Sequence, residues 1–499
     1  MLDLSRLSAE QREVVLAPDG PLLIVAGPGS GKTMVLAAKI AYLVGWRQIP
    51  PSSILAITFA TKAARELRAR LCGLLGERGA AVDVSTFHAF GLRIVRQWSE
   101  ELGLGPGPVA VYGEKEARAT LREVATHLQI DPDRYPLPEL SVRLERVRLG
   151  GRRAAPERGT VQAVADAYQE MLRHRGAVDY PAMLGLPLRL FIEHPSALRL
   201  CQDSYRVVLC DEFQDVCSSQ YAVLRSLAAR HHNLIVVGDP QQTLYGWRGA
   251  DIRFLDGFRR DFPETRIMGL DQNFRSTRQI VDCANALGAS LPSSRLLWTD
   301  NDFGGPIRLY AAADEQAEAA FVAAEIERLV AERIVDGVDQ VAILYRTNWQ
   351  ARPFTIALRQ RGLPYRSTLQ DRAEGARRDP DSWPVELQRN EEVACEADDT
   401  EGIRLSTIHQ AKGGEWTVVF VVGLEEGLLP HARALADGAD DQGASIDEER
   451  RVAYVAVTRA RERLYLSYCR TRRRGDRIEM RKPSRFLHGL PLAHVKRTA

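Results

Sequence analysis

The segment "AGPGSGKT" (26–33) combines the residue types that hold phosphate groups in proteins. It follows the apolar run "PLLIV" (21–25) and opens a helical pattern, which predicts a loop between a strand and a helix. Loop amides and a helix N-terminus together surround phosphate oxygens. Lys32 would reach the β- and γ-phosphates, and Thr33 would hold Mg²⁺.

The strict form of this motif has Gly at its first position, where the chain has Ala26, and a relaxed form with Ala or Gly fits. A chance glycine turn is the alternative, and the strand before and the helix after argue against it. We therefore predict an ATP site with Mg²⁺. Its loop residues are Ala26, Gly27, Pro28, Gly29, Ser30, Gly31, Lys32 and Thr33.

An acidic pair ends a second apolar run, "VVLCDEFQD" (207–215). Asp211 would lie near Mg²⁺, and Glu212 would orient and deprotonate the attacking water. Such a pair alone is usually solvated. In a chain that also has a phosphate-binding loop, it predicts hydrolysis rather than binding alone.

Phosphoryl transfer also needs positive charge on the γ-phosphate, which arginine fingers supply. Two candidates lie in the C-terminal half, Arg275 in "LDQNFRST" and Arg459 in "AYVAVTRARERL". For either residue alone, a surface salt bridge is the more common role.

The stretch "GDPQQTLYGWRGAD" (238–251) places Tyr245 and Trp247 among glycines, next to Gln242 and Arg248. Glycine-rich surroundings do not bury aromatic rings well. Such rings could stack on nucleic-acid bases, or they could pack into an interface between domains. The residues alone leave both roles open.

Several short β-branched runs are each followed by a helical pattern, which predicts buried parallel strands in an α/β fold. They form two groups, before and after about residue 273. The runs are 21–27, 54–60, 205–212, 233–239, 340–346, 403–409 and 416–423.

Two stretches interrupt these groups. From about 94 to 180 the pattern is helical with no convincing strand, which predicts a helical insertion into the first α/β unit. A polar stretch, 367–402, divides the second unit and is poor in apolar residues.

The chain has 499 residues, too many for one ordinary core, so two to four domains are expected. A hydrophobic fraction of 45% and a charged fraction of 26% are typical of soluble globular proteins. Seven cysteines without a C-x-x-C pair argue against a zinc site or a disulfide framework. With neither a signal-like N-terminus nor an 18-residue apolar run, we expect a cytoplasmic protein without membrane contact.

Net charge is only +2, which does not by itself indicate a nucleic-acid partner. The stretch "CRTRRRGDRIEMRKPSR" (469–485) is strongly basic. A solvated surface is the more common explanation for such a run.

Taken together and in this order, the motifs resemble those of the UvrD/Rep/PcrA-like DNA helicases of superfamily 1. The match spans nearly the whole chain. The corresponding segments are the Q motif at Gln11, motif I (26–33), Ia (57–71), Ib (85–94), II (211–215), III (238–251), IV (270–277), V (403–430) and VI (448–468).

The resemblance implies two RecA-like domains with ATP between them. The first would comprise 1–93 and 181–272, the second 273–499, and 94–180 would be the helical domain 1B. Implied roles are adenine reading for Gln11 and further nucleotide contacts for Phe274 and Glu415. Arg275 and Arg459 would be the fingers, and Gln242 would sense the γ-phosphate.

The resemblance also implies single-stranded DNA as a partner and places the two aromatic rings of motif III under its bases. The positions that match DNA-facing family residues are Phe59, His88, Tyr245, Trp247, Arg248, Thr407 and His409.

The chain departs from the family pattern at several positions. Met34 and Phe274 replace the usual Arg and Tyr that flank the adenine, and Thr61 replaces the usual Asn of motif Ia. In motif V, Gln410 and Gly414 replace the usual Lys and Leu.

The largest departure concerns domain 2B, which the family inserts before motif V and uses on duplex DNA. Here only 36 residues, 366 to 401, separate Tyr365 from Gly402. That length cannot hold a domain of the usual size.

The function implied is an ATP-dependent DNA helicase or translocase that moves 3′ to 5′ on single-stranded or tailed DNA, in repair, replication or recombination. A protein partner could supply the duplex contact. The alternative is a DNA-stimulated ATPase that remodels protein–DNA complexes without robust unwinding. A nuclease–helicase subunit is disfavoured because no nuclease domain follows motif VI.

Overall fold

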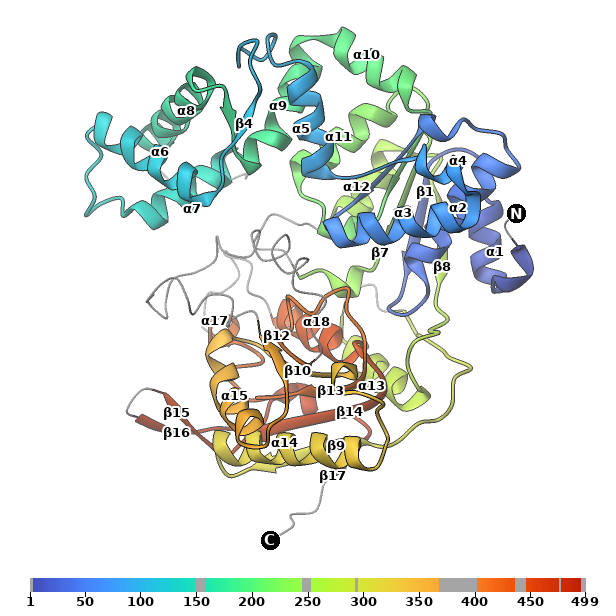
Figure 1. Cartoon of the computed structure of the whole chain (residues 1–499), viewed down its shortest axis with the longest axis vertical. Helices are drawn as coiled ribbons and strands as arrows, with labels where there is room; N and C mark the ends of the chain where they lie inside the picture. The colour runs from blue at the N-terminus through green and yellow to red at the C-terminus, as the bar shows by residue number, and fades with distance from the viewer. Residues whose placement is uncertain are drawn as a thin grey trace. The chain divides into compact units, whose positions relative to one another are not determined.

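The computed structural model describes residues 3–148, 158–244, 253–291, 295–367, 402–435, 446–474 and 477–494. Its contacts divide the chain into two compact units (Figure 1). The first comprises residues 1–24, 33–238 and 248–268. The second comprises 25–32, 239–247 and 269–499. Most residues of the predicted phosphate-binding loop (26–33) are therefore grouped with the second unit.

A six-stranded sheet lies largely in the first unit, in the order β3-β2-β6-β7-β1-β8. β2 pairs in parallel with both β3 and β6, and β6 pairs in parallel with β7. The strands are β1 (Leu22–Ala26), β2 (Ile54–Thr58), β3 (Asp83–Thr86), β6 (Val207–Cys210), β7 (Leu234–Gly238) and β8 (Arg266–Leu270). Because β2, β6 and β7 are buried along their whole length, they are apolar throughout.

Helices precede, join or follow these strands, and among them α3, α5 and α11 contact the sheet. They are α1 (Ala9–Leu16), α2 (Lys32–Gly45), α3 (Thr61–Leu75), α4 (Glu77–Ala80), α5 (Phe87–Gln97), α9 (Tyr180–Glu193), α10 (Pro195–Ser204), α11 (Ser218–Ala228) and α12 (Arg253–Asp261).

The chain between α5 and α9 forms a small hydrophobic core of its own. It is built by α6 (Glu114–His127), α7 (Leu137–Arg148) and α8 (Arg158–His174), around side chains such as Leu140 and Tyr168. The prediction that 94–180 contains no strand is wrong. β4 (Ala110–Val111) pairs in parallel with β5 (Ala177–Val178), and two-residue strands are too short to show a periodic pattern.

The second unit contains a seven-stranded, all-parallel sheet in the order β11-β12-β10-β13-β14-β9-β17. Its strands are β9 (Ile307–Ala312), β10 (Val341–Tyr345), β11 (Tyr365–Ser367), β12 (Ile403–Thr407), β13 (Trp416–Val421), β14 (Ala460–Cys469) and β17 (Leu492–His494). Successive residues of β10 belong to different cores, Ile343 to one and Leu344 to the other, because alternate side chains face opposite sides of a sheet.

Each core pairs the sheet with its own helices. One includes α13 (Arg278–Gly288) and α18 (Ile446–Val457). The other includes α14 (Glu315–Ala331) and α15 (Ala351–Gln360). The short helix α17 (Ala432–Leu435) contacts α18, and an antiparallel hairpin, β15 (Thr471–Arg474) with β16 (Arg477–Met480), follows β14.

The predicted α/β class is confirmed, and each of the seven predicted strands is present within two residues of its expected bounds. Strands with little apolar character were missed. β8 begins with exposed residues, and β14 begins with the charged run "ARERL", so neither has the apolar pattern of a buried strand. The polar stretch 367–402 lies outside the described residues except for its ends, Ser367 and Gly402.

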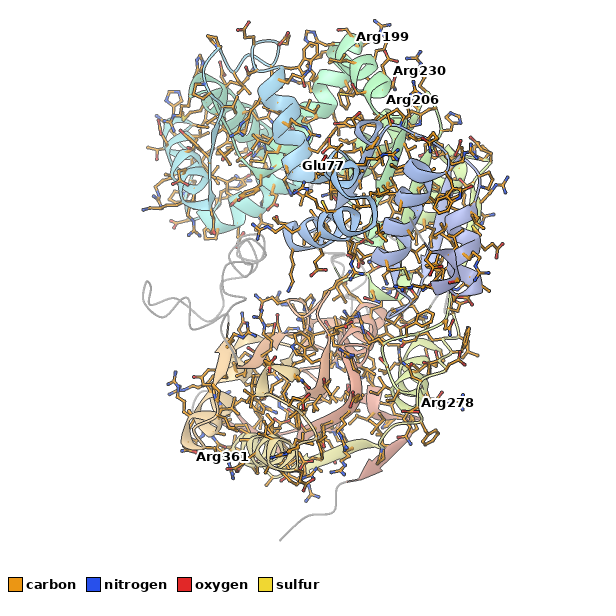
Figure 2. All side chains as sticks on the ribbon, turned by 45° about the vertical axis from the view of Figure 1, so that its right-hand side comes forward. Glu77, Arg199, Arg206, Arg230, Arg278 and Arg361 are labelled. Atoms are coloured by element: carbon orange, nitrogen blue, oxygen red, sulfur yellow. The ribbon has the colours of Figure 1, made fainter. Side chains whose placement is uncertain are left out.

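Charged side chains are spread over both units. Figure 2 labels six exposed ones: Glu77, Arg199, Arg206 and Arg230 on the first unit, and Arg278 and Arg361 on the second. None of the helices in the described part of the chain is long and apolar enough to cross a membrane.

Candidate active site

The phosphate-binding loop leaves the end of β1 and leads into α2 at Lys32. Gly29 and Gly31 have positive φ angles of 70° and 81°, which L side chains rarely adopt. A Cβ on Gly29 would lie 2.7 Å from both Arg275 Cβ and Asn273 Nδ2. The loop therefore needs glycine at this position for its backbone conformation and for the close approach of its neighbours.

The loop is held by its own hydrogen bonds. Ser30 Oγ donates to the Gly27 carbonyl at 2.7 Å. The Lys32 ammonium donates to the carbonyls of Ala26 and Gly27, at 3.2 and 3.3 Å. These bonds keep the ammonium against the loop, where the motif expects phosphate oxygens.

The carboxyl edge of the first sheet carries the acidic pair. Thr33 Oγ1 donates to Asp211 Oδ2 at 3.4 Å, and the Asp211 amide donates to the Ile57 carbonyl of β2 at 2.9 Å. A hydroxyl and a carboxylate are hard oxygen donors of the kind that Mg²⁺ prefers. The two residues predicted to hold the metal therefore lie together and fit that ion.

Glu212 has a left-handed backbone, with φ 51° and ψ 44°. Non-glycine residues rarely adopt this conformation, and it is concentrated at functional sites. Gln214 Nε2 donates to the Glu212 carboxylate, and Gln214 is itself buried. The carboxylate of the predicted general base is thus held by a buried amide two residues along the chain.

In the second unit, Arg459 follows α18 and is only 2% exposed. Its guanidinium donates to the carbonyls of Val455 (3.0 Å) and Gly414 (3.3 Å) and to Gln242 Oε1 (3.2 Å). Lys412 Nζ also donates to the Gln242 carbonyl, at 2.7 Å. The predicted finger and the predicted γ-phosphate sensor are therefore direct neighbours, with motif V beside both.

Gln242 is fixed from the other side as well. Its Nε2 donates to Asp239 Oδ2 at 2.8 Å, and both residues are buried. Asp239, Gln242 and Arg459 thus form one continuous hydrogen-bonded chain.

Arg275, the other predicted finger, makes an ion pair of 2.6 Å from Nε to Glu415 Oε2. Its Nη1 donates to the Thr458 carbonyl at 3.0 Å. Beside it, Asn273 Nδ2 donates to the Pro28 carbonyl (2.8 Å), and the Phe274 amide donates to the Gly29 carbonyl (2.9 Å). Motif IV is therefore bonded directly to the phosphate-binding loop.

The residues predicted to surround the base differ in exposure. Phe274 is 45% exposed, so its ring has a face available for stacking. Gln11 is only 3% exposed, and its side chain accepts from the Ser8 amide at 3.1 Å in the capping box of α1.

Four of the seven predicted DNA-contacting residues are described, and they follow strands at the carboxyl edges of the two sheets. Thr58 and Thr86 are register partners at the ends of β2 and β3, so Phe59 and His88 follow neighbouring strands. The His88 ring packs edge-on against Tyr180, with centroids 5.6 Å apart. Both Phe59 and His88 are partly buried.

In the second sheet, Thr407 ends β12 and is buried, and His409 follows it, partly buried. The Thr407 hydroxyl donates to Gln410 Oε1 at 3.2 Å. Tyr245, Trp247 and Arg248 lie outside the described residues.

Two family models match the chain. The UvrD/REP helicase N-terminal domain covers residues 7–263, and the UvrD-like helicase C-terminal domain covers 268–372 and 385–471. The first alone covers more than half of the 499 residues.

The chain belongs to the UvrD/Rep helicase family.

Similar family members include the ATP-dependent DNA helicase PcrA of Staphylococcus aureus strain MRSA252, which is 28% identical over 98% of this chain and 86% of the relative. PcrA of Staphylococcus epidermidis strain ATCC 35984 is 29% identical over 97% of this chain and 86% of the relative. The solved C-terminal domain of a possible DNA helicase from Lactobacillus is 18% identical and covers 44% of this chain and 98% of that one. Its TM-score of 0.27 is too low to indicate a shared fold.

The alignment with the S. aureus PcrA extends over 637 residues, whereas this chain has 499, so at least 138 aligned positions have no counterpart here. The match to the UvrD-like C-terminal model is interrupted between residues 372 and 385, inside the polar stretch. This UvrD/Rep family chain is therefore shorter than its relative within the aligned region.

Three residues of this UvrD/Rep site were not predicted: Gln214, Asn273 and Lys412. Each lies inside a motif that had been found, beside a residue that had been assigned a role. Asn273 is two residues before Arg275, and Gln214 is two residues after Glu212. In the sequence, only their polar character could have marked these residues as part of the site. Asn273 binds Pro28 and Lys412 binds Gln242, and both partners are distant in sequence.

Proposed function

We propose that this protein is an ATP-dependent DNA helicase or translocase that moves 3′ to 5′ along single-stranded DNA. Membership of the UvrD/Rep family and the similarity to ATP-dependent DNA helicases named PcrA support this proposal. The repair, replication or recombination of DNA in the cytoplasm would be its setting.

Hydrolysis would use residues from motifs I, II, IV and VI. Glu212 would take the proton of the attacking water, and Lys32 and the loop amides would hold the β- and γ-phosphates. Thr33 and Asp211 would hold Mg²⁺, which when bound would neutralise charge on the phosphate oxygens. Arg275 and Arg459 would stabilise the charge that grows on the γ-phosphate in the transition state.

The observation that carries the proposal of motion is the hydrogen bond between Arg459 and Gln242, 3.2 Å long. Gln242 lies three residues before Tyr245 and five before Trp247, the rings that we propose to stack on bases. The side chain of Gln242 would thus connect the arginine finger Arg459 to the base-stacking segment. A change at the γ-phosphate would then alter the affinity for DNA.

Further DNA contacts would come from the carboxyl edges of the two sheets. Phe59 and His88 would contribute from the first sheet, and Thr407 and His409 from the second, together with Arg248. We propose that 1–93 with 181–272 and 273–499 form the two RecA-like domains, and that 94–180 is domain 1B.

A second candidate function is favoured by one observation. Only residues 366 to 401 separate Tyr365 from Gly402, where relatives would carry domain 2B. A DNA-stimulated ATPase that remodels protein–DNA complexes needs translocation on one strand and not duplex separation.

A strand-displacement assay beside a single-strand translocation assay tests these functions. Tailed duplexes with a 3′ or a 5′ overhang would be used, with Glu212→Gln as the inactive control. Displacement and translocation from the 3′ tail support the helicase, and translocation alone supports the remodelling ATPase. Movement from the 5′ tail, or no DNA-dependent hydrolysis at all, would contradict both.

A further inference from the structure

Lys39 is a lysine in the interior of the first unit. It lies in the middle of α2, is 1% exposed, and has buried apolar residues on both sides in sequence. Lysine is almost never fully buried unless its charge is compensated. No carboxylate lies within ion-pair distance of it among the described residues.

The charge of Lys39 is compensated by the last turn of α1. Its ammonium donates to the carbonyl of Val15 at 3.1 Å and to that of Ala17 at 2.5 Å. The final carbonyls of a helix lack intrahelical partners and carry partial negative charge, so a cation is stabilising there. Lys39 therefore caps α1 from the side chain of a different helix.

This cap matters because α1 has only eight residues. Two turns of helix are marginal without external contacts. At its other end, Ser8 and Gln11 form a capping box, in which the Gln11 amide donates to Ser8 Oγ at 3.3 Å. Gln11 is thus built into the first turn of a helix whose last turn is held by Lys39.

The helix that carries Lys39 also begins at the phosphate-binding loop. Thr33 precedes Lys39 by six residues, a rise of about 9 Å along one continuous helix. α2 therefore links the phosphate-binding residues at its start to the cap on α1 near its middle.

We infer that Lys39 is a positioning residue for adenine: by fixing α1 against α2, its ammonium keeps Gln11 at a constant place relative to Thr33 in the first turn of α2. The inference rests on the proposed function, in which Gln11 reads the base. Its consequence is that Lys39 contributes to base selectivity without touching the nucleotide.

Other charged groups do not offer Lys39 an alternative contact. Asp19 and Arg47 act on it with opposite sign and pair with each other at 2.8 Å, and Tyr42 presents its ring at 5.6 Å. Burial lowers the pKa of Lys39 to about 8, with Asp19 opposing that shift. Without the carbonyls of Val15 and Ala17, the buried ammonium would have no hydrogen-bond acceptor among the described residues, which favours the contact between α1 and α2 seen here.

The test compares steady-state hydrolysis of ATP and GTP, with single-stranded DNA present, by the full chain and by its variants. For Lys39→Met we expect KM for ATP to rise by about three- to tenfold, as for the loss of one hydrogen bond. KM for GTP and both kcat values should stay within about twofold, so the preference for ATP falls. Lys39→Arg, which keeps the cation, should restore the preference.

Arg78→Met is the matched control, because Arg78 Nη2 donates to the Val44 carbonyl in the last turn of α2, at 2.9 Å. It removes a cationic cap of the same kind without touching α1. We expect it to lower the melting temperature and leave the ATP-to-GTP ratio unchanged. If Lys39→Met does not fold, Lys39→Gln is measured instead, and its preference should also fall.

An unchanged ATP-to-GTP ratio in a folded Lys39→Met or Lys39→Gln variant would overturn the inference and leave Lys39 a purely stabilising role. Gln11→Ala separates this result from failure of the underlying proposal. A Gln11→Ala variant with wild-type base preference would remove Gln11 from adenine reading, and the inference with it. A wild-type chain without DNA-stimulated hydrolysis would instead refute the proposed function.

Discussion

At the residue scale, the groups proposed for catalysis are held in place by neighbours that do no chemistry. Gln214 holds the Glu212 carboxylate, Asp239 holds Gln242, and Asn273 is bonded to the phosphate-binding loop. Positioning of this kind is part of what makes a general base or a charge effective.

The first prediction concerns the general base. Glu212→Gln should bind ATP with little change and lose hydrolysis by roughly 10²–10⁴-fold, because the water loses its base while Asp211 is untouched. DNA-stimulated turnover and binding of a fluorescent nucleotide analogue measure the two effects. Glu264→Gln, an exposed carboxylate of the same unit, should behave as wild type. Near-normal turnover in Glu212→Gln would remove Glu212 from this role.

The second prediction concerns the arginines. Arg459→Ala and Arg275→Ala should each lower kcat by roughly 10³–10⁵-fold, and KM for ATP far less, because the charge they neutralise grows in the transition state. Arg459→Lys should recover only part of the rate, since an ammonium cannot make all the contacts of the guanidinium. A change confined to KM would assign these residues to ground-state binding.

At the element scale, buried ion pairs tie the second sheet to the loops and helices around it. Arg472 of β15 pairs with Glu318 of α14 at 2.8 Å and with Glu425 after β13 at 2.6 Å. Glu318, Glu425 and Cys469 form a group of metal-ligand type, and the guanidinium of Arg472 lies within hydrogen-bonding distance of all three. We therefore assign these three side chains a structural role and not a metal site.

The third prediction follows from that network. Arg472→Met should destabilise the second unit by about 3–5 kcal/mol, because two fully buried carboxylates lose their counter-charge. The midpoint of thermal unfolding reports the change. Arg477→Met, on the exposed strand of the same hairpin, is the control and should have little effect. An unchanged midpoint in Arg472→Met would show that the network contributes no net stability.

The fourth prediction concerns α18, which leads to Arg459. Burial and the charge of Glu449 raise the pKa of Glu448 to about 7 from 4.5, with Arg346 and Arg451 opposing. The folded state then holds this proton more tightly than the unfolded chain, so stability should fall as pH rises from about 4.5 to about 7.

Glu448→Gln should remove that part of the pH dependence. Melting temperatures of the wild type and the variant, measured across this range, test it. Parallel profiles for the two proteins would contradict the raised pKa.

At the scale of the whole molecule, the short segment that we propose stands in place of domain 2B is the feature with the widest consequence. Net charge is only +2, and exposed arginines are spread over both units (Figure 2). A large duplex-binding surface is therefore not expected, and single-strand contacts should dominate.

The fifth prediction is a preference for single-stranded or tailed DNA with weak unwinding by the isolated monomer. Each neutralised phosphate adds about 0.9 to the salt slope on duplex and about 0.7 on single strands. A small duplex footprint should therefore give a shallow slope for duplex. Binding titrations at several salt concentrations test this. Processive unwinding of long duplexes by a proven monomer without a partner would refute it.

The amino-acid sequence was enough to predict the fold class and the family, and to locate the glycine loop at 26–33 and the acidic pair at 211–212. These features depend on short-range patterns. A strand, a glycine loop and a helix start are contiguous from 21 to 33, and apolar runs such as 233–239 are buried because of their own composition. Local pattern failed for β4, β5, β8 and β14, which are too short or too polar to be recognised without their neighbours.

Which distant groups meet depends on the tertiary structure. Arg459 and Gln242 are 217 residues apart, and Arg275 and Glu415 are 140 apart. The sequence also did not predict that Lys39 caps α1 or that Arg472 pairs with Glu318 and Glu425. Spacing along a chain specifies contacts only within a few turns of helix or one hairpin. Beyond that, the partner of a charged side chain is set by how buried strands and helices pack.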